Sequence, residues 1–207
     1  MLDRKALEAV GGWKSYRVER VEWPDSQRRT LSVHLKAVAK VMRCSQCGGR
    51  CEQVHETTVR RVRDLPLFEF RVVLHVPRRR LWCPRCGGPR LEQLDWLGRY
   101  QRVTNRFAEA VERLLQSATV QAVAAFFDLG WHTVKAIDKR RLRARLVEPD
   151  WSAIRYLAMD EFALHKGHRY ATVVVEPISR QVLWIGQGRS RETARAFFEQ
   201  LPAGVAK

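Results

Sequence analysis

Alternation of apolar and polar residues near the start of the chain predicts two β-strands. The segments 15–23 and 30–41 both alternate in this way. Pro24-Asp25-Ser26, between the two segments, consists of residues that favour turns. We therefore expect two strands joined by a turn. One face of the second strand should carry a row of apolar side chains, namely Leu31, Val33 and Leu35.

A second pair of strands is predicted at 57–63 and 68–76. Asp64-Leu65-Pro66 lies between these segments, and we expect it to separate the two strands. The later strand should continue through Pro77 into the run Arg78-Arg79-Arg80-Leu81-Trp82. The first third of the chain is thus predicted to be rich in β-structure.

Helical spacing of apolar residues replaces alternation after residue 104. Thr104 is a suitable N-cap for a first helix. The apolar face of that helix is expected at Phe107, Val111, Leu114 and Leu115. Residues 120–137 then match the pattern of a helix-turn-helix, whose buried positions are expected at Val123, Phe127, Leu129, Val134 and Ile137.

Three small or turn-forming residues support the helix-turn-helix interpretation. Ala124 is small enough to let two helices cross closely. Asp128 occupies the turn position, where it tolerates a left-handed backbone better than most residues. Gly130 then opens the second helix. An ordinary helical hairpin with a basic outer face is the alternative.

The second helix of this motif, at about residues 131–146, is strongly basic. A recognition helix in the major groove would place its first turns at base edges, here Gly130, His132, Thr133, Lys135 and Ala136. The more C-terminal basic residues would lie beside phosphates. The basic residues of the helix, set against Asp138 alone, are Lys135, Lys139, Arg140, Arg141, Arg143 and Arg145.

The last third of the chain changes back to strands. An apolar run at 156–159 ends at Asp160-Glu161, and further strands are predicted at 170–176 and 181–186 after a basic turn at 164–169. A helix capped by Ser190 follows. We expect it to align Ala194, Phe197, Phe198 and Leu201 along one face.

The composition favours a folded protein that binds a polyanion. The 207 residues include 38 Lys and Arg against 22 Asp and Glu, for a net charge of +16, and 45% are hydrophobic. Nucleic acid is the expected partner of such a chain. Arginine enrichment from a GC-rich genome is the alternative. No stretch has the length of a membrane span or of a signal-peptide core, so we expect a cytoplasmic protein.

Arginine is concentrated between residues 58 and 90. This segment holds nine arginines and only two acidic residues, Asp64 and Glu69. Arginine binds phosphate bidentately, so a DNA backbone is the expected ligand of this surface. A solvated strand edge that its charge protects from aggregation is the alternative. The residues expected to contact DNA here are Arg60, Arg61, Arg78, Arg79 and Arg80.

Two copies of a C-x-x-C-G-G motif predict a metal site. They lie at 44–49 and 83–88, and this spacing lets two thiolates of each copy share one tetrahedral cation. In a reducing compartment such pairs indicate metal ligands rather than disulfides. We therefore expect a structural Zn²⁺ site in a zinc ribbon. Its expected ligands are Cys44, Cys47, Cys83 and Cys86, with Cys51 and His55 left as possible alternates.

These motifs together resemble a family of insertion-sequence transposases. Asp160-Glu161-Phe162, Lys166-Gly167-His168-Arg169-Tyr170 and the strand 172–175 are similar to the start of a DDE transposase domain. Segments 60–66 and 133–140 also resemble the family. The order zinc ribbon, helix-turn-helix, ribonuclease-H-like domain is that of the ISL-three (ISL3) family, and the resemblance covers nearly the whole chain.

The resemblance implies that Asp160 is the first catalytic aspartate. Such enzymes use three carboxylates to hold two divalent ions, for which Mg²⁺ is suited. No aspartate follows Asp160, and Glu176 on the second strand is a poor substitute. We therefore expect a truncated chain that is catalytically silent by itself, with Mg²⁺ relevant only to a complete domain.

The sequence thus predicts a multidomain α+β protein. The expected domains are a zinc ribbon at 1–95, a helix-turn-helix at 96–148 and an incomplete ribonuclease-H-like β-β-β-α unit at 149–207. The expected function is DNA binding at the terminal inverted repeats of an insertion sequence, with a homo-oligomer or a full-length transposase as possible partners. A zinc-ribbon, helix-turn-helix transcription regulator is the first alternative, and an RNA-binding zinc ribbon of the translation apparatus is the second.

Overall fold

The computed structural model describes residues 3–25, 27, 29–146, 148–165 and 169–202. Contacts within the chain divide it into two compact units, Met1–Ala144 and Arg145–Lys207. Ser26 of the expected first turn and residues 166–168 of the expected basic turn lie outside the described residues.

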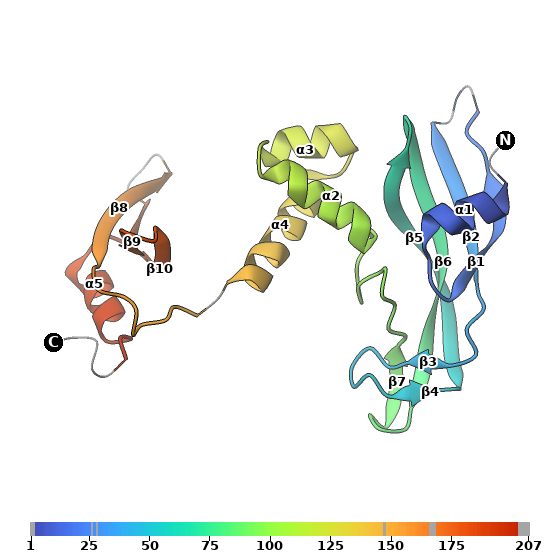
Figure 1. Cartoon of the computed structure of the whole chain (residues 1–207), viewed down its shortest axis with the longest axis horizontal. Coiled ribbons are helices and arrows are strands. Elements are labelled where there is room, and N and C mark those ends of the chain that lie inside the picture. The colour runs from blue at the N-terminus through green and yellow to red at the C-terminus, as the bar shows by residue number, and fades with distance from the viewer. Residues whose placement is uncertain (1–2, 26, 28, 147, 166–168, 203–207) are drawn as a thin grey trace. The chain divides into compact units, whose positions relative to one another are not determined.

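The first unit is built on a large sheet (Figure 1). Its strands are β1 (Tyr16–Glu22), β2 (Thr30–Ala37), β5 (Val54–Leu67), β6 (Phe70–Cys83) and β7 (Gly88–Leu91), in the order β1-β2-β6-β5 with β7 also paired to β6. The β1–β2 and β5–β6 pairs are antiparallel, whereas β2 and β6 run parallel. Both predicted strand pairs are therefore confirmed.

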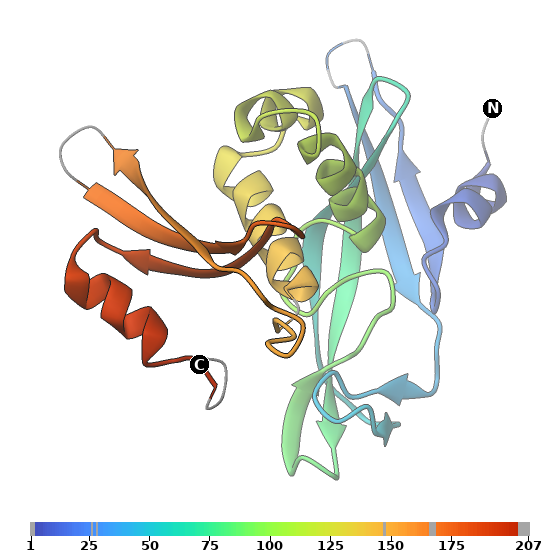
Figure 2. The ribbon, with the colours of Figure 1, turned by 60° about the vertical axis from the view of Figure 1, so that its left-hand side comes forward.

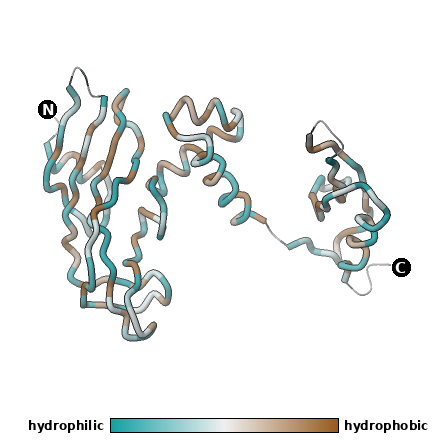
Figure 3. Tube along the Cα trace, turned by 180° about the vertical axis from the view of Figure 1, so that it is seen from behind, coloured by the Kyte–Doolittle hydropathy of each residue, from teal (hydrophilic) through white to brown (hydrophobic). Residues whose placement is uncertain are grey.

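A short helix, α1 (Arg4–Gly11), packs against β1 and contributes Leu7 to the core of this sheet. The sequence pattern did not predict it. The core also contains the three apolar residues expected on one face of β2, because side chains alternate between the two faces of a strand. Figure 3 shows apolar and polar stretches alternating along these strands.

The turn of the long hairpin lies later than expected. We expected Asp64-Leu65-Pro66 to separate the strands, but β5 continues through these residues to Leu67. The ladder between β5 and β6 is irregular between Asp64 and Leu67, and this irregularity accommodates a proline that cannot donate a hydrogen bond. The tight turn is at Phe68, whose φ of 54° is left-handed.

The hairpin β5–β6 extends beyond the main core toward the cysteine motifs (Figure 2). A two-stranded sheet of β3 (Met42–Arg43) and β4 (Arg50–Cys51) flanks the first motif, and β6 ends at the second. A separate small core forms here. Its fully buried members are Met42, Cys44, Cys51, Leu81 and Cys83.

Three helices complete the first unit: α2 (Asn105–Leu115), α3 (Val120–Phe127) and α4 (Trp131–Arg145). The cap predicted at Thr104 is confirmed, since its hydroxyl accepts a hydrogen bond from the Phe107 N–H. Of the predicted buried positions of the helix-turn-helix, four are fully buried and Leu129 is half-buried. The predicted helix-turn-helix is therefore confirmed as structure.

The second unit is a three-stranded antiparallel sheet with one helix. Its elements are β8 (Ala158–His165), β9 (Arg169–Glu176), β10 (Gln181–Gln187) and α5 (Arg191–Phe198), with strand order β10-β9-β8. The predicted β-β-β-α arrangement is confirmed. None of the described helices in either unit is long and apolar enough to cross a membrane.

Two details of this unit differ from the sequence-based expectation. Asp160 was expected where the apolar run at 156–159 ends, but it lies inside β8, opposite Val173, and β8 is an edge strand among the described strands. Phe198 was expected on the packed face of α5. Phe197 is buried as expected, with its ring centroid 5.7 Å from that of Trp184, but Phe198 remains 55% exposed.

Candidate metal centre and nucleic-acid interface

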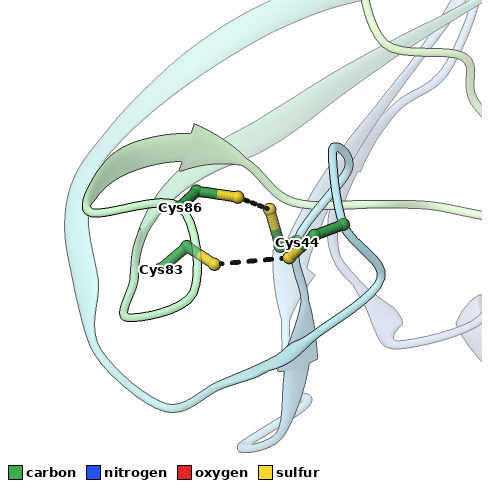
Figure 4. Close-up of side chains that lie close together, drawn as sticks. Cys44, Cys83 and Cys86 are labelled. Atoms are coloured by element: carbon green, nitrogen blue, oxygen red, sulfur yellow. Dashed lines mark hydrogen bonds between the residues drawn. The ribbon is translucent and has the colours of Figure 1, made fainter.

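The four cysteines of the paired motifs come together at the end of the β5–β6 hairpin (Figure 4). Their sulfur atoms all lie within 4.8 Å of one another. The Cys44 and Cys86 sulfurs are 3.9 Å apart, and those of Cys47 and Cys83 are 3.6 Å apart. Each pair joins one motif to the other.

These distances fit a tetrahedral zinc site. Four sulfurs at about 2.3 Å from one central Zn²⁺ form a tetrahedron whose edges measure about 3.8 Å. The observed separations of 3.6 and 3.9 Å bracket that value. Four sulfur ligands leave no open position, which is typical of a structural rather than a catalytic site.

The backbone of each motif curls so that both sulfurs point inward. Gly48 and Gly87 adopt φ values of 68° and 64°, a left-handed conformation in which glycine is not strained. The Gly48 N–H donates to the Cys44 carbonyl oxygen at 2.9 Å. The first motif is also tied to the strand that follows the second motif, since the Ser45 N–H donates to the carbonyl oxygen of Leu91 on β7 at 2.9 Å.

The electrostatics of the cluster favour a cation. Burial raises the pKa of Cys83, but the Cys86 backbone N–H and the neighbouring thiols lower it more, to about 6. The pKa of Cys86 is raised by its hydrogen bond with Cys47 and by burial. One thiolate thus forms readily while another is disfavoured, and four thiolates this close require a shared positive charge. The cysteine cluster therefore fits structural Zn²⁺.

The two possible alternate ligands lie outside this cluster. Cys51 is 2% exposed, and its sulfur lies 3.7 Å from the Gly49 carbonyl oxygen. Burial raises the pKa of Cys51 to about 11, which favours the neutral thiol of a core residue. His55 lies beside Trp82, with ring centroids 6.4 Å apart.

The helix-turn-helix presents one exposed helix on a buried support. Val134 and Ile137 anchor α4 in the core, while His132, Thr133 and Lys135 in its first turns are exposed. The Lys135 ammonium lies 4.5 Å from the centre of the Trp131 ring. Asp128 has the left-handed backbone expected of the turn, with φ of 49°.

The predicted phosphate contacts on α4 fall into two groups. Lys139, Arg140 and Arg143 are exposed. Arg141, in contrast, forms an ion pair with Glu112 of α2, Nη1 to Oε2 2.6 Å. This ion pair holds α4 against α2, but the Arg141 side chain is still 37% exposed, so its expected contact with a phosphate remains a prediction.

Two arginines that were not predicted as site residues hold the turn of the helix-turn-helix. Arg63 on β5 donates from Nη1 to the Asp128 carbonyl oxygen at 3.0 Å and from Nη2 to the Phe127 carbonyl oxygen at 3.1 Å. Arg71 on β6 pairs with the Asp128 carboxylate. The orphan carbonyls at the end of α3 are thus satisfied by the sheet. The density of arginine in residues 58–90 was the available signal in the sequence. It did not reveal which groups Arg63 and Arg71 bind.

Arg78 and Arg79 are corrected as DNA contacts, because they are only 1% and 7% exposed. Arg79 donates from Nε to Glu92 Oε2 at 2.9 Å, and Arg78 donates from Nη2 to the Glu92 carbonyl oxygen at 3.0 Å. The cause is a gap in the sheet. The β2–β6 pairing ends at His75 and the β6–β7 pairing begins at Arg80, so the residues between them fill the space.

The other predicted arginine contacts of this segment remain accessible. Arg61 and Arg80 are exposed and Arg60 is half-buried. Arg60 and Arg61 lie on opposite faces of β5, because successive side chains of a strand alternate.

Asp160 is exposed, and its Oδ1 accepts a hydrogen bond from the Glu161 N–H at 2.7 Å. Within the described residues, the cysteine cluster is the one place where three or more potential metal-ligating side chains gather. Among the described residues, no further metal-ligating side chains therefore gather with Asp160. Glu176 is the last residue of β9, and its carboxylate accepts a hydrogen bond from the Ser179 N–H. This hydrogen bond lowers the pKa of Glu176, which indicates a turn-stabilising role.

Three protein-family models match consecutive parts of the chain. A model described as the zinc-finger of transposase IS204/IS1001/IS1096/IS1165 matches residues 40–89. The helix-turn-helix domain of transposase family ISL3 matches residues 92–142. A DDE model of the same family, described as transposase, matches residues 157–207. The cysteine cluster and the helix-turn-helix lie in the first two regions.

Curated relatives agree with these matches. The chain is 76% identical over all 207 residues to the transposase for insertion sequence element IS1001 of Bordetella parapertussis, and it spans 51% of that protein. It is 28% identical over 167 residues to the transposase for insertion sequence element IS1557 of Mycobacterium tuberculosis, and it spans 37% of that protein. No solved structure matches the chain.

The chain thus spans about half, or less, of the length of these relatives. All three matched regions point to one family, in the module order that the sequence predicted. From its zinc ribbon, its helix-turn-helix and the DDE region that follows, the chain belongs to the ISL3 family of insertion-sequence transposases.

Proposed function

We propose that this chain binds the ends of an insertion element and that α4 is its recognition helix. The observation that carries the proposal is the arrangement of α4. Its first turns are exposed and basic, while Val134 and Ile137 fix its orientation on α2 and α3. A helix so presented can enter the major groove of B-DNA.

The roles proposed for the residues of α4 follow from their positions along the helix. His132, Thr133 and Lys135 in the first turns read base edges, and Lys139, Arg140 and Arg143 further along contact phosphates. The IS1001 and IS1557 relatives are named for the elements that they serve. By analogy, the proposed ligand is the terminal inverted repeats of the element that carries this sequence.

Zinc has a structural role in this proposal. The four cysteines join two loops that are 39 residues apart in sequence, and their core is small. Metal binding supplies folding free energy to such a region.

We also propose the boundaries 1–95, 96–148 and 149–207 for the three modules, and a nucleoid-associated location for the protein.

We propose that Asp160 corresponds to the first carboxylate of the family's catalytic centre. The two-metal route needs additional carboxylates beside it, and the described residues do not gather them. The chain by itself is therefore proposed to bind DNA without cleaving it.

Selection from genomic DNA tests this function. Zinc-loaded protein is incubated with sheared DNA of its own host, and the retained fragments are sequenced. The expected result is enrichment of the two ends of one insertion element, with loss of enrichment in Lys135→Ala. Lys5→Ala, an exposed lysine on α1, is the matched control. Enrichment at promoters would favour the transcription-regulator alternative, and retention without any shared sequence would overturn recognition by α4.

A further inference from the structure

A basic groove lies in the first unit, outside the helix-turn-helix. It has a volume of about 430 Å³, and strands β5, β6 and β7 form it together with the segment that follows β7. The groove continues the face of β5 that is apolar at Val62, since Arg60, Thr58 and Glu56 follow at steps of two residues. This face of β5 is therefore apolar at Val62, where it belongs to the core, and polar or charged from Arg60 to Glu56.

The charge of the groove is predominantly positive. Arg60, Arg80, Arg90 and Arg99 line it, against the single carboxylate of Glu56. Arg80 Nη1 and Glu56 Oε2 are 3.4 Å apart, and both side chains are almost half exposed. Such an exposed pair contributes little to stability, so an anionic ligand can compete for the guanidinium.

Arg90 connects the groove with the metal centre. Its Nη1 donates to the Pro89 carbonyl oxygen at 2.9 Å, and its Nη2 donates to the Cys86 carbonyl oxygen at 3.4 Å. Its Nε has no hydrogen-bond partner among the described residues. The cysteine motif thus holds this guanidinium in place with one buried donor unused.

Arg99 and Tyr100 close the other side of the groove. Leu97, 2% exposed, anchors the segment after β7 in the main core. The Gln101 N–H donates to the Gly98 carbonyl oxygen at 3.2 Å, which turns the chain between them. Tyr100 remains 66% exposed, and the Arg99 guanidinium lies 5.0 Å from the centre of its ring. An exposed aromatic ring beside arginines offers a flat apolar surface next to groups that bind phosphate.

We propose that this groove binds the sugar-phosphate backbone of DNA, as a second contact surface separate from α4. The proposal rests on the DNA-binding function proposed above. The arginines pair with phosphates, Thr58 and Gln46 add neutral donors, and Tyr100 packs against a sugar. A groove of this kind adds affinity and register without reading sequence, which leaves base recognition to α4.

Salt-dependent binding tests the groove. Fluorescence anisotropy of the zinc-loaded full chain is measured with a labelled random-sequence duplex of about 30 base pairs, between about 50 and 300 mM salt. The test variant is Arg80→Gln with Arg99→Gln. The matched control is Arg4→Gln with Arg17→Gln, two exposed arginines on α1 and β1. Zinc content and thermal unfolding are compared across all variants.

The expected result is specific to the groove. Losing two phosphate contacts reduces the slope of log K against log salt by about 2 and weakens binding about tenfold or more near 150 mM salt. The control pair, with the same change of charge, should change the slope by less than half as much. Tyr100→Ala should weaken binding without changing the slope, whereas Tyr100→Phe should bind like the wild type.

The outcomes separate the groove from the proposed function. If the wild type binds and the groove variant matches the control, the groove proposal is overturned while DNA binding through α4 stands. If the wild type binds no duplex, the DNA-binding function itself fails, and the groove with it. Arg99→Gln alone, on an exposed loop, is the second variant if the double substitution reduces zinc content. Its slope should fall by about 1, and an unchanged slope overturns the proposal.

Discussion

Arg106 of α2 donates from Nη2 to the fully buried Asp64 of β5, with 2.6 Å between Nη2 and Oδ2. The same carboxylate accepts hydrogen bonds from Trp13 Nε1 at 2.9 Å and from the Thr104 hydroxyl at 2.6 Å. One carboxylate therefore joins the N-terminal segment, the sheet and the start of α2. This network holds the start of α2 against the sheet of the first unit.

Asp64→Ala is expected to destabilise the first unit by about 3 kcal/mol, because it leaves the donors of Trp13, Thr104 and Arg106 without their shared acceptor. The measurement is the midpoint of urea unfolding followed by tryptophan fluorescence. Glu69→Gln, which removes a carboxylate at the exposed hairpin tip, is the control and should leave the midpoint unchanged. Equal midpoints for the two variants would show that the network is not stabilising.

Substitution of the cysteines distinguishes metal ligands from core residues. Zinc content should be about one ion per chain in the wild type and in Cys51→Ala, but should fall sharply in Cys47→Ser. The expected loss follows from the position of the Cys47 sulfur 3.6 Å from that of Cys83. Elemental analysis of purified protein measures it. Loss of zinc in Cys51→Ala would require a different ligand set.

Chelation should unfold the end of the hairpin without unfolding the main core. The core at Met42, Leu81 and the cysteines is small and depends on the metal, whereas the core beneath α1 contains no cysteine. Hydrogen exchange before and after addition of EDTA would reveal this as lost protection confined to 40–55 and 80–92. Uniform loss of protection over the whole first unit would contradict it.

Arg63→Ala should weaken DNA binding by α4 from a distance. Two charge-assisted hydrogen bonds to the end of α3 are lost, and their loss costs about 1.5–3 kcal/mol of local stability. Reduced amide protection in α3 and α4 together with weaker DNA binding is the expected result. Arg17→Ala, an exposed arginine on β1, is the control. Identical protection in both variants would rule out this support.

His75 makes the stability of the sheet depend on pH. Its ring stacks on that of His34 at 4.1 Å, and burial, then His34 and Arg61, lower the pKa of His75. The unfolded chain therefore binds a proton at higher pH than the folded chain does. The contribution of neutral His75 to the free energy of unfolding is present above about pH 6.5. It is lost as the pH falls through the lower pKa of His75 in the folded chain.

Urea unfolding of the wild type and of His75→Gln at pH 5 to 7.5 measures this effect. The wild type should lose more stability than the variant on acidification. Parallel pH profiles for the two proteins would contradict a titrating role of His75.

The metal site and the helix-turn-helix were predictable because their signals are local. Two C-x-x-C-G-G motifs determine which sulfurs can meet, and Asp128 before Gly130 marks a turn between two apolar repeats. These signals do not depend on how the strands are ordered in the sheet. The same is true of the Thr104 and Ser190 caps, which act on their own helices.

Which arginines are exposed and which are buried was not predictable, because it depends on how the strands pair. Arg78, Arg79 and Arg80 are adjacent and chemically identical, yet only Arg80 is exposed. The difference arises from the place where β2 leaves β6 and β7 joins it. The role of Asp64 could not be predicted for a similar reason, since Trp13, Thr104 and Arg106 lie 40 or more residues away from it in the sequence.

Recognition of element ends by α4 is tested by comparing the affinity for one element end with the affinity for a shuffled duplex of the same length and composition. At about 150 mM salt, the wild type should prefer the element end by about 10³-fold or more. His132→Ala with Lys135→Ala should reduce that ratio at least tenfold while retaining binding to the shuffled duplex. A ratio near one for the wild type, or an unchanged ratio for the variant, would contradict recognition of element ends by α4.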